Sequence, residues 1–235
     1  MLLNERAELI CQATGKPSPQ IVWHSLSGGK LPSIERKDLE AFAKAHAAGR
    51  PTGEIAVTEM TLDDTALRSR LVGYEGFESI GFHKNVAFLT VETEINDKPT
   101  GYLIRADVRG NELVLQEDTL RPLFTQTTLG NLAYEAILVD DDRVQVLYEL
   151  KGGPNHRPQV LSFDHSLQWK GTRRLKPIEY RITDATSRLA DGTFYVMNYH
   201  WPGSDWKSES CALAERFGVG ATHAKTEVAA LPFFL

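Results

Sequence analysis

The stretch YEAILVDDDRVQVLYE, residues 134–149, decides the fold of this chain. It begins and ends on the dipeptide Tyr-Glu, and its two apolar runs flank a polar segment with three aspartates and an arginine. Short apolar runs on either side of a turn predict a β-hairpin, and aspartates are ordinary residues of such a turn. Because an antiparallel pair folds back on itself, its first and last residues meet at one end. We therefore expect Glu135 and Glu149 to lie side by side, at the end of the hairpin opposite the aspartates.

The same arrangement recurs twice more along the chain. FESIGFHKNVAFLTVE (77–92) and TDATSRLADGTFYVMN (183–198) align with residues 134–149. Each segment has an acid at its second position and a carboxylate or amide 14 places later, and the opening acids are 57 and 49 residues apart. This spacing suits one four-stranded propeller blade per repeat. The six oxygen-bearing residues are Glu78, Glu92, Glu135, Glu149, Asp184 and Asn198.

The remaining pattern predicts a mainly-β chain folded as one propeller-like domain over residues 1–235. Short β-rich segments alternate with turn signals from residue 54 onward. A complete ring of this kind has about five to six blades, and three clear blades with part of a fourth predict a truncated ring or one completed in an unusual way. The blades are expected at about 73–122, 132–175 and 179–230, with no clear blade in 1–70. Two short helical insertions are expected, at about 36–48 and 205–217.

Length and composition exclude several classes of protein. With 235 residues and 42% hydrophobic content, the chain can bury a substantial core. It has no apolar run of about 18 residues, so we expect no transmembrane helix and no membrane partner. Polar residues at 4–6 interrupt the N-terminal apolar stretch, which does not fit a secretory signal. We expect a soluble protein, cytoplasmic, or exported if the N-terminus is incomplete.

Charge and cysteine content further limit the classes of partner and of metal site that we expect. The formal net charge is -5, and Lys and Arg are scattered along the sequence. Binding to phosphate backbones needs a clustered basic face, so we expect no nucleic-acid partner. Cys11 and Cys211 form neither a metal motif nor a disulfide framework, and their pairing is left open, as is the oligomeric state.

In a propeller, the first strand of each blade lies nearest the central axis, so the six oxygen-bearing residues are expected to surround one mouth of the channel. Carboxylates gathered in one place repel one another unless something compensates their charge. Calcium is the expected ion because it takes six to eight oxygen ligands in flexible geometry, and magnesium is the alternative. No His or Cys set has the spacing of a zinc site. The opposing interpretation is that these residues are solvated strand ends, alike because the repeats fold alike.

A second group of candidates surrounds the expected mouth. His200 is the expected proton carrier, and Tyr199 and Trp201 are expected to stack a ligand. His156 and Arg157 follow Glu149 in the chain, and Arg157 is expected to pair with an anionic substrate. The alternatives are a packed aromatic loop for the first group and a solvated turn for the second.

Several motifs taken together resemble a known group of proteins. They are GYEGFESI, NLAYEAILV, LYE, IEYRITDAT, GTFYVMNYHWPG and GATHAKTE. As a set, they resemble bacterial β-propeller proteins related to the group called "esterase-like activity of phytase", over about residues 31–227. The resemblance implies a propeller, often of about six blades and often exported, with an acidic central channel that can hold calcium.

Three functions fit these observations. The first is a calcium-dependent hydrolase of esters or phosphoesters, in which the metal orients a substrate oxygen and activates water. Its substrate would be a small molecule or an anionic ester. The second is a non-enzymatic propeller that binds a ligand or a protein and whose metal is structural. The third is a truncated propeller with neither property. An enzyme requires an open coordination position, whereas a binding module predicts a closed metal shell and no turnover.

Overall fold

The computed structural model describes residues 30–34, 45, 48–50, 57–130, 132–150, 154–178, 181–188, 192–199 and 228–233. In these residues the protein is mainly β, which confirms the mainly-β class expected from the strand patterns. The helical insertions expected at about 36–48 and 205–217 fall almost wholly outside the described residues. No helix in the described part of the chain is long and apolar enough to cross a membrane.

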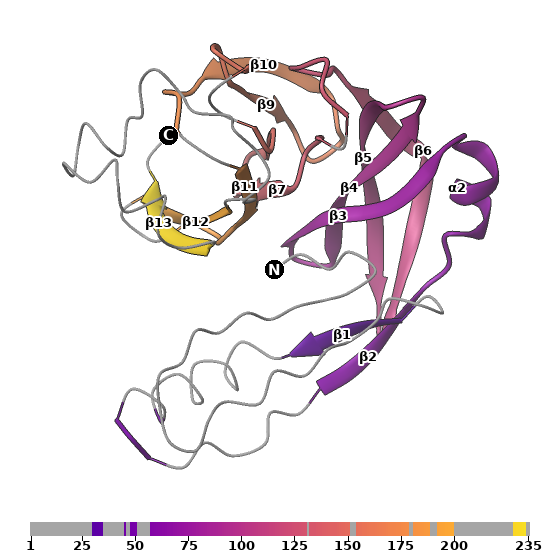
Figure 1. The fold of residues 1–235 in the computed structure, drawn as a ribbon. Helices are drawn as coiled ribbons and strands as arrows, with labels where there is room; N and C mark the ends of the chain where they lie inside the picture. Colours follow the sequence, from indigo (N-terminus) through magenta and orange to yellow (C-terminus); the bar gives the residue numbers. More distant parts are fainter. Residues whose placement is uncertain are drawn as a thin grey trace.

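The first sheet is built on an antiparallel meander of four consecutive strands. These are β3 (Tyr74–His83), β4 (Val86–Ile95), β5 (Lys98–Arg109) and β6 (Glu112–Leu123). Two earlier strands extend the sheet beyond β6. Strand β2 (Val57–Leu62) runs parallel to β6, and β1 (Lys30–Ile34) pairs antiparallel with β2. Figure 1 shows this pair reaching away from the other strands.

Two further sheets follow in chain order. The second is a meander of β7 (Ala136–Val139), β8 (Val144–Leu147), β9 (Gln159–Phe163) and β10 (Trp169–Arg174). The third consists of β11 (Arg181–Ala185), β12 (Phe194–Tyr199) and β13 (Val228–Phe233). All pairs within these two sheets are antiparallel. The expected hairpin is therefore present as β7 and β8, closed at its turn by a hydrogen bond of 2.9 Å from Asp140 N–H to the Arg143 carbonyl.

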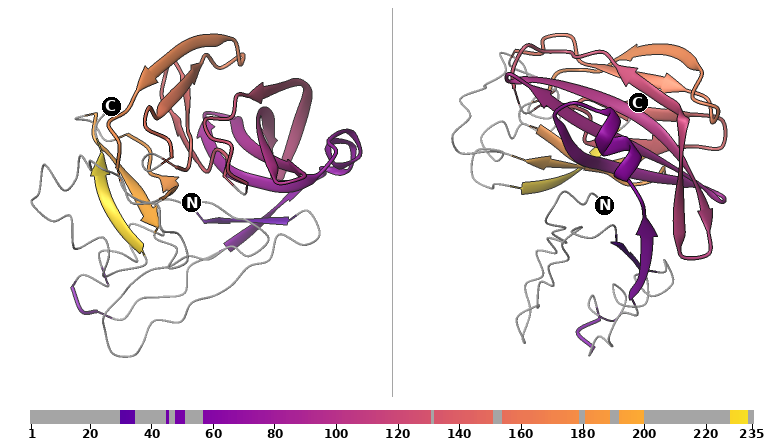
Figure 2. Two further views of the ribbon diagram at one scale, coloured as in Figure 1. Left: turned by 45° about the horizontal axis from the view of Figure 1, so that its top comes forward. Right: turned by 90° about the vertical axis from the view of Figure 1, so that its right-hand side faces the viewer.

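Strand β7 lies between the first strands of the two other meanders. It contacts β3 on one side and β11 on the other, and Figures 1 and 2 show the three sheets side by side around this region. Two hydrophobic clusters account for the packing. Ile137 belongs to the cluster shared with Phe88 and Leu103 of the first sheet, while Leu138 belongs to the cluster shared with Ile182 and Phe194 of the third. Successive side chains of a strand point to opposite faces, so an uninterrupted apolar run such as AILV is what a strand buried on both faces requires.

The far face of the first sheet is covered locally. Leu67 and Leu71, in and directly after α2 (Thr65–Arg70), pack with Leu89 and Ile104 in a third cluster. This short helix was not expected from the sequence.

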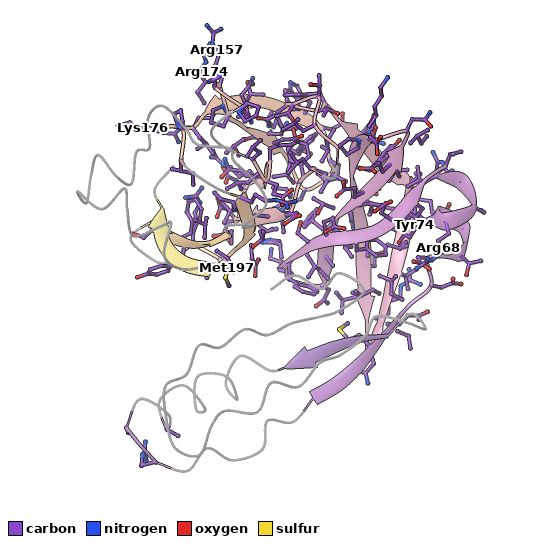
Figure 3. All side chains as sticks on the ribbon, in the orientation of Figure 1. Arg68, Tyr74, Arg157, Arg174, Lys176 and Met197 are labelled. Atoms are coloured by element: carbon purple, nitrogen blue, oxygen red, sulfur yellow. The ribbon has the colours of Figure 1, made fainter. Side chains whose placement is uncertain are left out.

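Asp64 connects α2 to the first sheet through side-chain hydrogen bonds. Its carboxylate accepts hydrogen bonds of 2.9 Å from Arg68 Nε and from the Tyr74 hydroxyl. The Arg68 guanidinium stacks over the Tyr74 ring at 4.7 Å from its centroid, and Figure 3 shows the two side chains together. A helix too short to be stable alone is thus held by tertiary contacts.

The contact between β3 and β7 leaves no room for a side chain at Gly81. A methyl group there would lie 2.6 Å from Val139 Cγ2 and 3.2 Å from Ile137 Cγ2. We expect Gly81→Ala to lower the free energy of unfolding by about 1–3 kcal/mol through overpacking. Val139→Ala should relieve the clash, so that the double variant loses less stability than the sum of the two single variants. Urea unfolding of the four proteins measures this coupling, and strictly additive losses would argue against the packing of β3 on β7.

Candidate functional site

Glu135 and Glu149 flank the β7–β8 hairpin, as the sequence predicts. Glu135 directly precedes β7, and Glu149 follows β8 by two residues. The backbone of Glu149 is fixed on two sides: its N–H donates to the Ala133 carbonyl and its carbonyl accepts from Ile182 N–H, both at 2.8 Å. Glu149 is therefore held between the segment that leads into β7 and the first strand of the third sheet.

Glu78 and Glu92 come to the same place from the first sheet. In the β3–β4 ladder Glu92 pairs with Gly76, and the register shifts between Phe77 and Ser79. Glu78 is the extra residue of this β-bulge. Bulges bend a strand and re-aim a side chain, and they are common beside functional sites. The sequence placed Glu78 at the end of a hairpin, whereas the structure extends both strands beyond it.

These four residues form what we call the glutamate cluster: Glu78, Glu92, Glu135 and Glu149. Their carboxyl groups influence one another electrostatically. Burial raises the pKa of Glu78 to about 7, and the charges of Glu149 and Glu75 add to the effect. Burial also raises the pKa of Glu92 to about 8, with contributions from Glu78 and Glu149. The carboxyl groups of two successive repeats therefore meet, and Glu78 and Glu92 titrate near neutral pH instead of near 4.5.

Glu135 and Glu149 are the two members of the cluster whose carboxyl groups influence each other's pKa most directly. Burial raises the pKa of Glu135 well above its usual range, and the negative charges of Glu149 and Glu78 raise it further. Burial likewise raises the pKa of Glu149, although Arg181 and a hydrogen bond from Glu135 oppose the shift. A protonated Glu135 beside an ionised Glu149 is the arrangement these influences favour, since two adjacent buried carboxyl groups do not readily ionise together.

Arg181 supplies the positive charge at the cluster. It is the first residue of β11, and its Nε contacts Glu149 Oε1 while its Nη2 lies 4.0 Å from Glu135 Oε1. Its charge also lowers the pKa of Glu78, but it is not among the influences on Glu92. Sequence reasoning missed this arginine. It stands three residues before Asp184 in the motif IEYRITDAT, and nothing local in that motif distinguishes it from a surface arginine.

Glu92 is the least compensated member of the cluster. Its side chain is buried, at 5% exposure. Within the described residues its Oε1 has no hydrogen-bond partner. A buried carboxyl oxygen without a partner is costly, because it has lost its water without gaining a replacement. Glu92 Oε1 is therefore an oxygen that a cation or a ligand donor could satisfy.

The residues expected from the third repeat lie on β11 and β12. Asp184 is half-buried, and its Oδ1 accepts a hydrogen bond of 2.7 Å from Ala185 N–H. Asn198 lies opposite Ile182 on β11 and Ala229 on β13, and its side chain is outside the described residues. The contribution of the third sheet that the structure establishes at the cluster is thus Arg181.

The remaining candidates are placed only in part. His200 and Trp201 lie outside the described residues, as does the side chain of Tyr199 on β12. His156 and Arg157 are exposed in the connection between β8 and β9. That connection is anchored by buried Asn155, whose Nδ2 donates to the Leu150 carbonyl at 2.7 Å.

In its present arrangement the cluster is better suited to binding protons than to coordinating a metal ion. In the part of the chain that the structure describes, no group of three or more His, Cys, Asp or Glu side chains is arranged to hold a metal ion. Arg181 and bound protons compensate the carboxyl groups instead. Chemically, such a cluster can exchange protons near neutral pH, and it can bind a cation if the protons leave.

Comparison with known proteins adds no identification. No model of a known protein family matches the chain, and no curated protein matches it. The resemblance to the phytase-related propellers remains a prediction from sequence motifs.

Because the cluster takes up protons on folding, we expect stability to fall as the pH rises. Glu78 and Glu92 have pKa values of about 7 and about 8 when folded, against 4.5 as the ordinary value. Between these limits the folded protein binds more protons than the unfolded chain, so the free energy of unfolding decreases with pH. The total loss should be on the order of several kcal/mol. Urea unfolding with a chelator present, at about pH 5 and about pH 8, measures it.

Two variants test whether the cluster causes this pH dependence. Glu92→Gln mimics the protonated side chain, so it should flatten the dependence and be more stable than the wild type at the upper end of the window. Glu112→Gln removes an exposed carboxylate from β6 and should leave the dependence unchanged. A wild type equally stable at both pH values would contradict the burial of ionisable glutamates.

The ion pair of Arg181 should also be measurable. Arg181→Met leaves Glu149 buried without its cation, and we expect a loss of about 2–4 kcal/mol in the free energy of unfolding. Glu149→Gln in the same background should restore part of that loss, because the uncompensated charge is removed. Arg109→Met, at an arginine 64% exposed on β5, serves as the control. Equal losses for the two arginine variants would show that Arg181 does not stabilise the cluster.

Proposed function

We propose that the protein is a propeller-like protein that binds a divalent cation, with calcium favoured, at the glutamate cluster. The arrangement of the sheets supports the propeller. Two of the three sheets contain four-stranded antiparallel meanders in chain order, and the first strands β3, β7 and β11 lie next to one another. In propellers each blade is such a meander, its first strand is innermost, and its faces pack on the neighbouring blades. The two clusters on either face of β7 fit that packing.

The single observation that carries the cation proposal is the convergence of four buried or half-buried glutamates, three of which, Glu78, Glu135 and Glu149, are influenced by the charge of Arg181. Oxygen ligands from carboxylates suit a hard cation, and the flexible coordination of calcium tolerates an irregular set better than the octahedron of magnesium. The partnerless Glu92 Oε1 is an oxygen that such an ion would satisfy. Glu78, Glu92, Glu135 and Glu149 would hold the ion, with Asp184 and Asn198 as further oxygen donors from the third sheet.

Binding requires the cluster to change from its described arrangement. The carboxyl groups have to lose their protons and to turn toward a common centre. The raised pKa values of Glu78 and Glu92 keep these two groups partly protonated near neutral pH, so protons compete with the cation. When bound, the ion would neutralise the carboxylates and polarise an oxygen of a substrate or ligand.

Hydrolysis of an ester or phosphoester is the second candidate function. Glu78 favours it, because a half-buried carboxyl with a pKa of about 7 can both donate and accept a proton at neutral pH. The glutamates need no metal for that role. His200 as a further proton carrier, Tyr199, Trp201 and His156 as ligand contacts, and Arg157 as the partner of an anionic group remain predictions. A binding protein with a structural metal is the non-enzymatic alternative.

Calcium titration followed by thermal unfolding tests the primary proposal. We expect calcium to raise the melting temperature of the wild type by several degrees once its concentration is about a hundred times the dissociation constant. Glu135→Gln should lose most of that shift, while Glu112→Gln on β6 should keep it. Magnesium in place of calcium should give a smaller shift. No shift in the melting temperature of the wild type, or equal shifts in all three proteins, would contradict a metal site at the glutamate cluster.

The same proteins distinguish the enzyme from the binding protein. Hydrolysis of phosphoesters and lactones is assayed in the presence of calcium and, separately, in the presence of a chelator. Turnover that depends on calcium and is lost in Glu135→Gln supports a metal-dependent hydrolase, and turnover in chelator that is lost in Glu78→Gln supports acid–base catalysis by the glutamates. Calcium binding without turnover supports the non-enzymatic propeller.

A further inference from the structure

Strand β10 carries a concentration of positive charge that the glutamate cluster does not explain. Residues 169–176, WKGTRRLK, contain four Lys and Arg residues and no acid, in a chain whose net charge is -5. Every residue of β10 except Gly171 is exposed, and so is Lys176 beyond its end. Lys170 is neutralised by Asp164, with its Nζ 2.8 Å from Oδ2.

Arg157 adds to this charge from the neighbouring strand connection. Arg174 pairs with Gln159, and Leu175 N–H donates to the Pro158 carbonyl at 2.8 Å. Figure 3 shows Arg157 beside Arg174 at the top of the view, with Lys176 lower and to the left. Together with Arg173, these three residues form what we call the basic edge. Within the described residues none of the four has an ion-pair partner.

No described strand pairs with the outer side of β10. The strand is the last of its sheet and pairs with β9 alone among the described strands. Since the Leu175 N–H points to β9, and successive N–H groups of a strand alternate between its two edges, the N–H groups of Thr172 and Arg174 point outward. Unpaired donors and acceptors in a row are a template for an added strand.

Charge on an edge strand commonly protects it against self-association, and the basic edge would repel a second copy of itself. Protection does not account for the aromatic residues at its beginning. Trp169 is 51% exposed, and its ring packs edge-on against Phe124, which is 45% exposed, and against Phe163. An exposed indole beside open backbone and unpaired cations is typical of a recognition surface.

We propose that the outer edge of β10 binds an extended acidic peptide segment of a partner protein, which adds to the sheet as a fifth strand. Arg173 and Arg174 point to opposite faces of the sheet because they are adjacent in a strand. The partner therefore needs acidic residues at adjacent positions, one for each face, and an apolar residue toward Trp169. Opposite charges on neighbouring strands then stabilise the pairing.

Single-stranded nucleic acid is the competing polyanion, and the geometry favours it less. A phosphate chain could use Arg174 and the neighbouring Arg157 but not Arg173 on the opposite face, whereas an added strand has a position for each arginine of β10. Nucleic acid also cannot continue the ladder of backbone hydrogen bonds that the edge of β10 offers. The acidic peptide uses both the charges and the ladder.

Fluorescence anisotropy with the full chain tests the proposal. The probe is a labelled peptide of the length of β10, with two adjacent glutamates flanked by valine, threonine and leucine. We expect it to bind, and we expect a form N-methylated at alternate residues to bind about tenfold more weakly, because it cannot complete the ladder. Arg173→Glu combined with Arg174→Glu should weaken binding by about tenfold or more, since two attractive cross-strand pairs become repulsive.

A charge-matched control separates the edge from the overall charge. Lys84→Glu combined with Lys98→Glu changes the net charge equally at exposed lysines of the first sheet, and it should leave the affinity unchanged. Thermal unfolding by circular dichroism identifies any variant that has lost its fold. Absence of peptide binding, equal binding of the N-methylated peptide, or tighter binding of oligodeoxythymidylate would overturn the proposal. The glutamate cluster is untouched by these variants, so the cation proposal is tested independently.

Discussion

The burial of β7 on both faces is the constraint on which the rest of the structure depends. Four residues, Ala136–Val139, pack alternately on the first and the third sheet. Apolar burial of this kind is the main favourable contribution to the free energy of folding. Because the interior is closely packed, a change at one contact of the strand affects its neighbours. With β7 in place, β3 and β11 are held on either side of it, and the segments at the end of the β7–β8 hairpin are brought together.

The glutamate cluster is a consequence of that packing. Glu135 and Glu149 have to lie where the hairpin ends, and the same end faces the β3 bulge and the beginning of β11. Burial of these carboxyl groups opposes folding unless protons, Arg181 or another cation compensates them. The apolar contacts of β7 therefore hold together groups that would separate if they were free, which is how functional sites commonly retain unfavourable electrostatics.

Sequence reasoning reached the mainly-β class and named all four glutamates of the cluster for identifiable reasons. The runs AILV and VQVL have the length and composition of buried strands, and the Tyr-Glu repeats placed Glu135 beside Glu149 through hairpin geometry alone. Helix α2 was missed because six residues carry too little periodicity to stand out. Arg181 was missed because its role depends on β11 lying against β7, which is a contact between segments that are distant in the chain.

By itself, the sequence determined the local elements: strands from apolar runs, turns from aspartate and glycine, and carboxylates in pairs at hairpin ends. These follow from interactions between near neighbours, whose geometry the backbone limits to a few choices. Only the tertiary structure decided which pairs meet, which arginine compensates them, and that β10 is the last of the described strands of its sheet, with a basic outer edge. Those outcomes depend on how the sheets pack and on which strand comes last in each, because burial and long-range charge are properties of the assembled sheets.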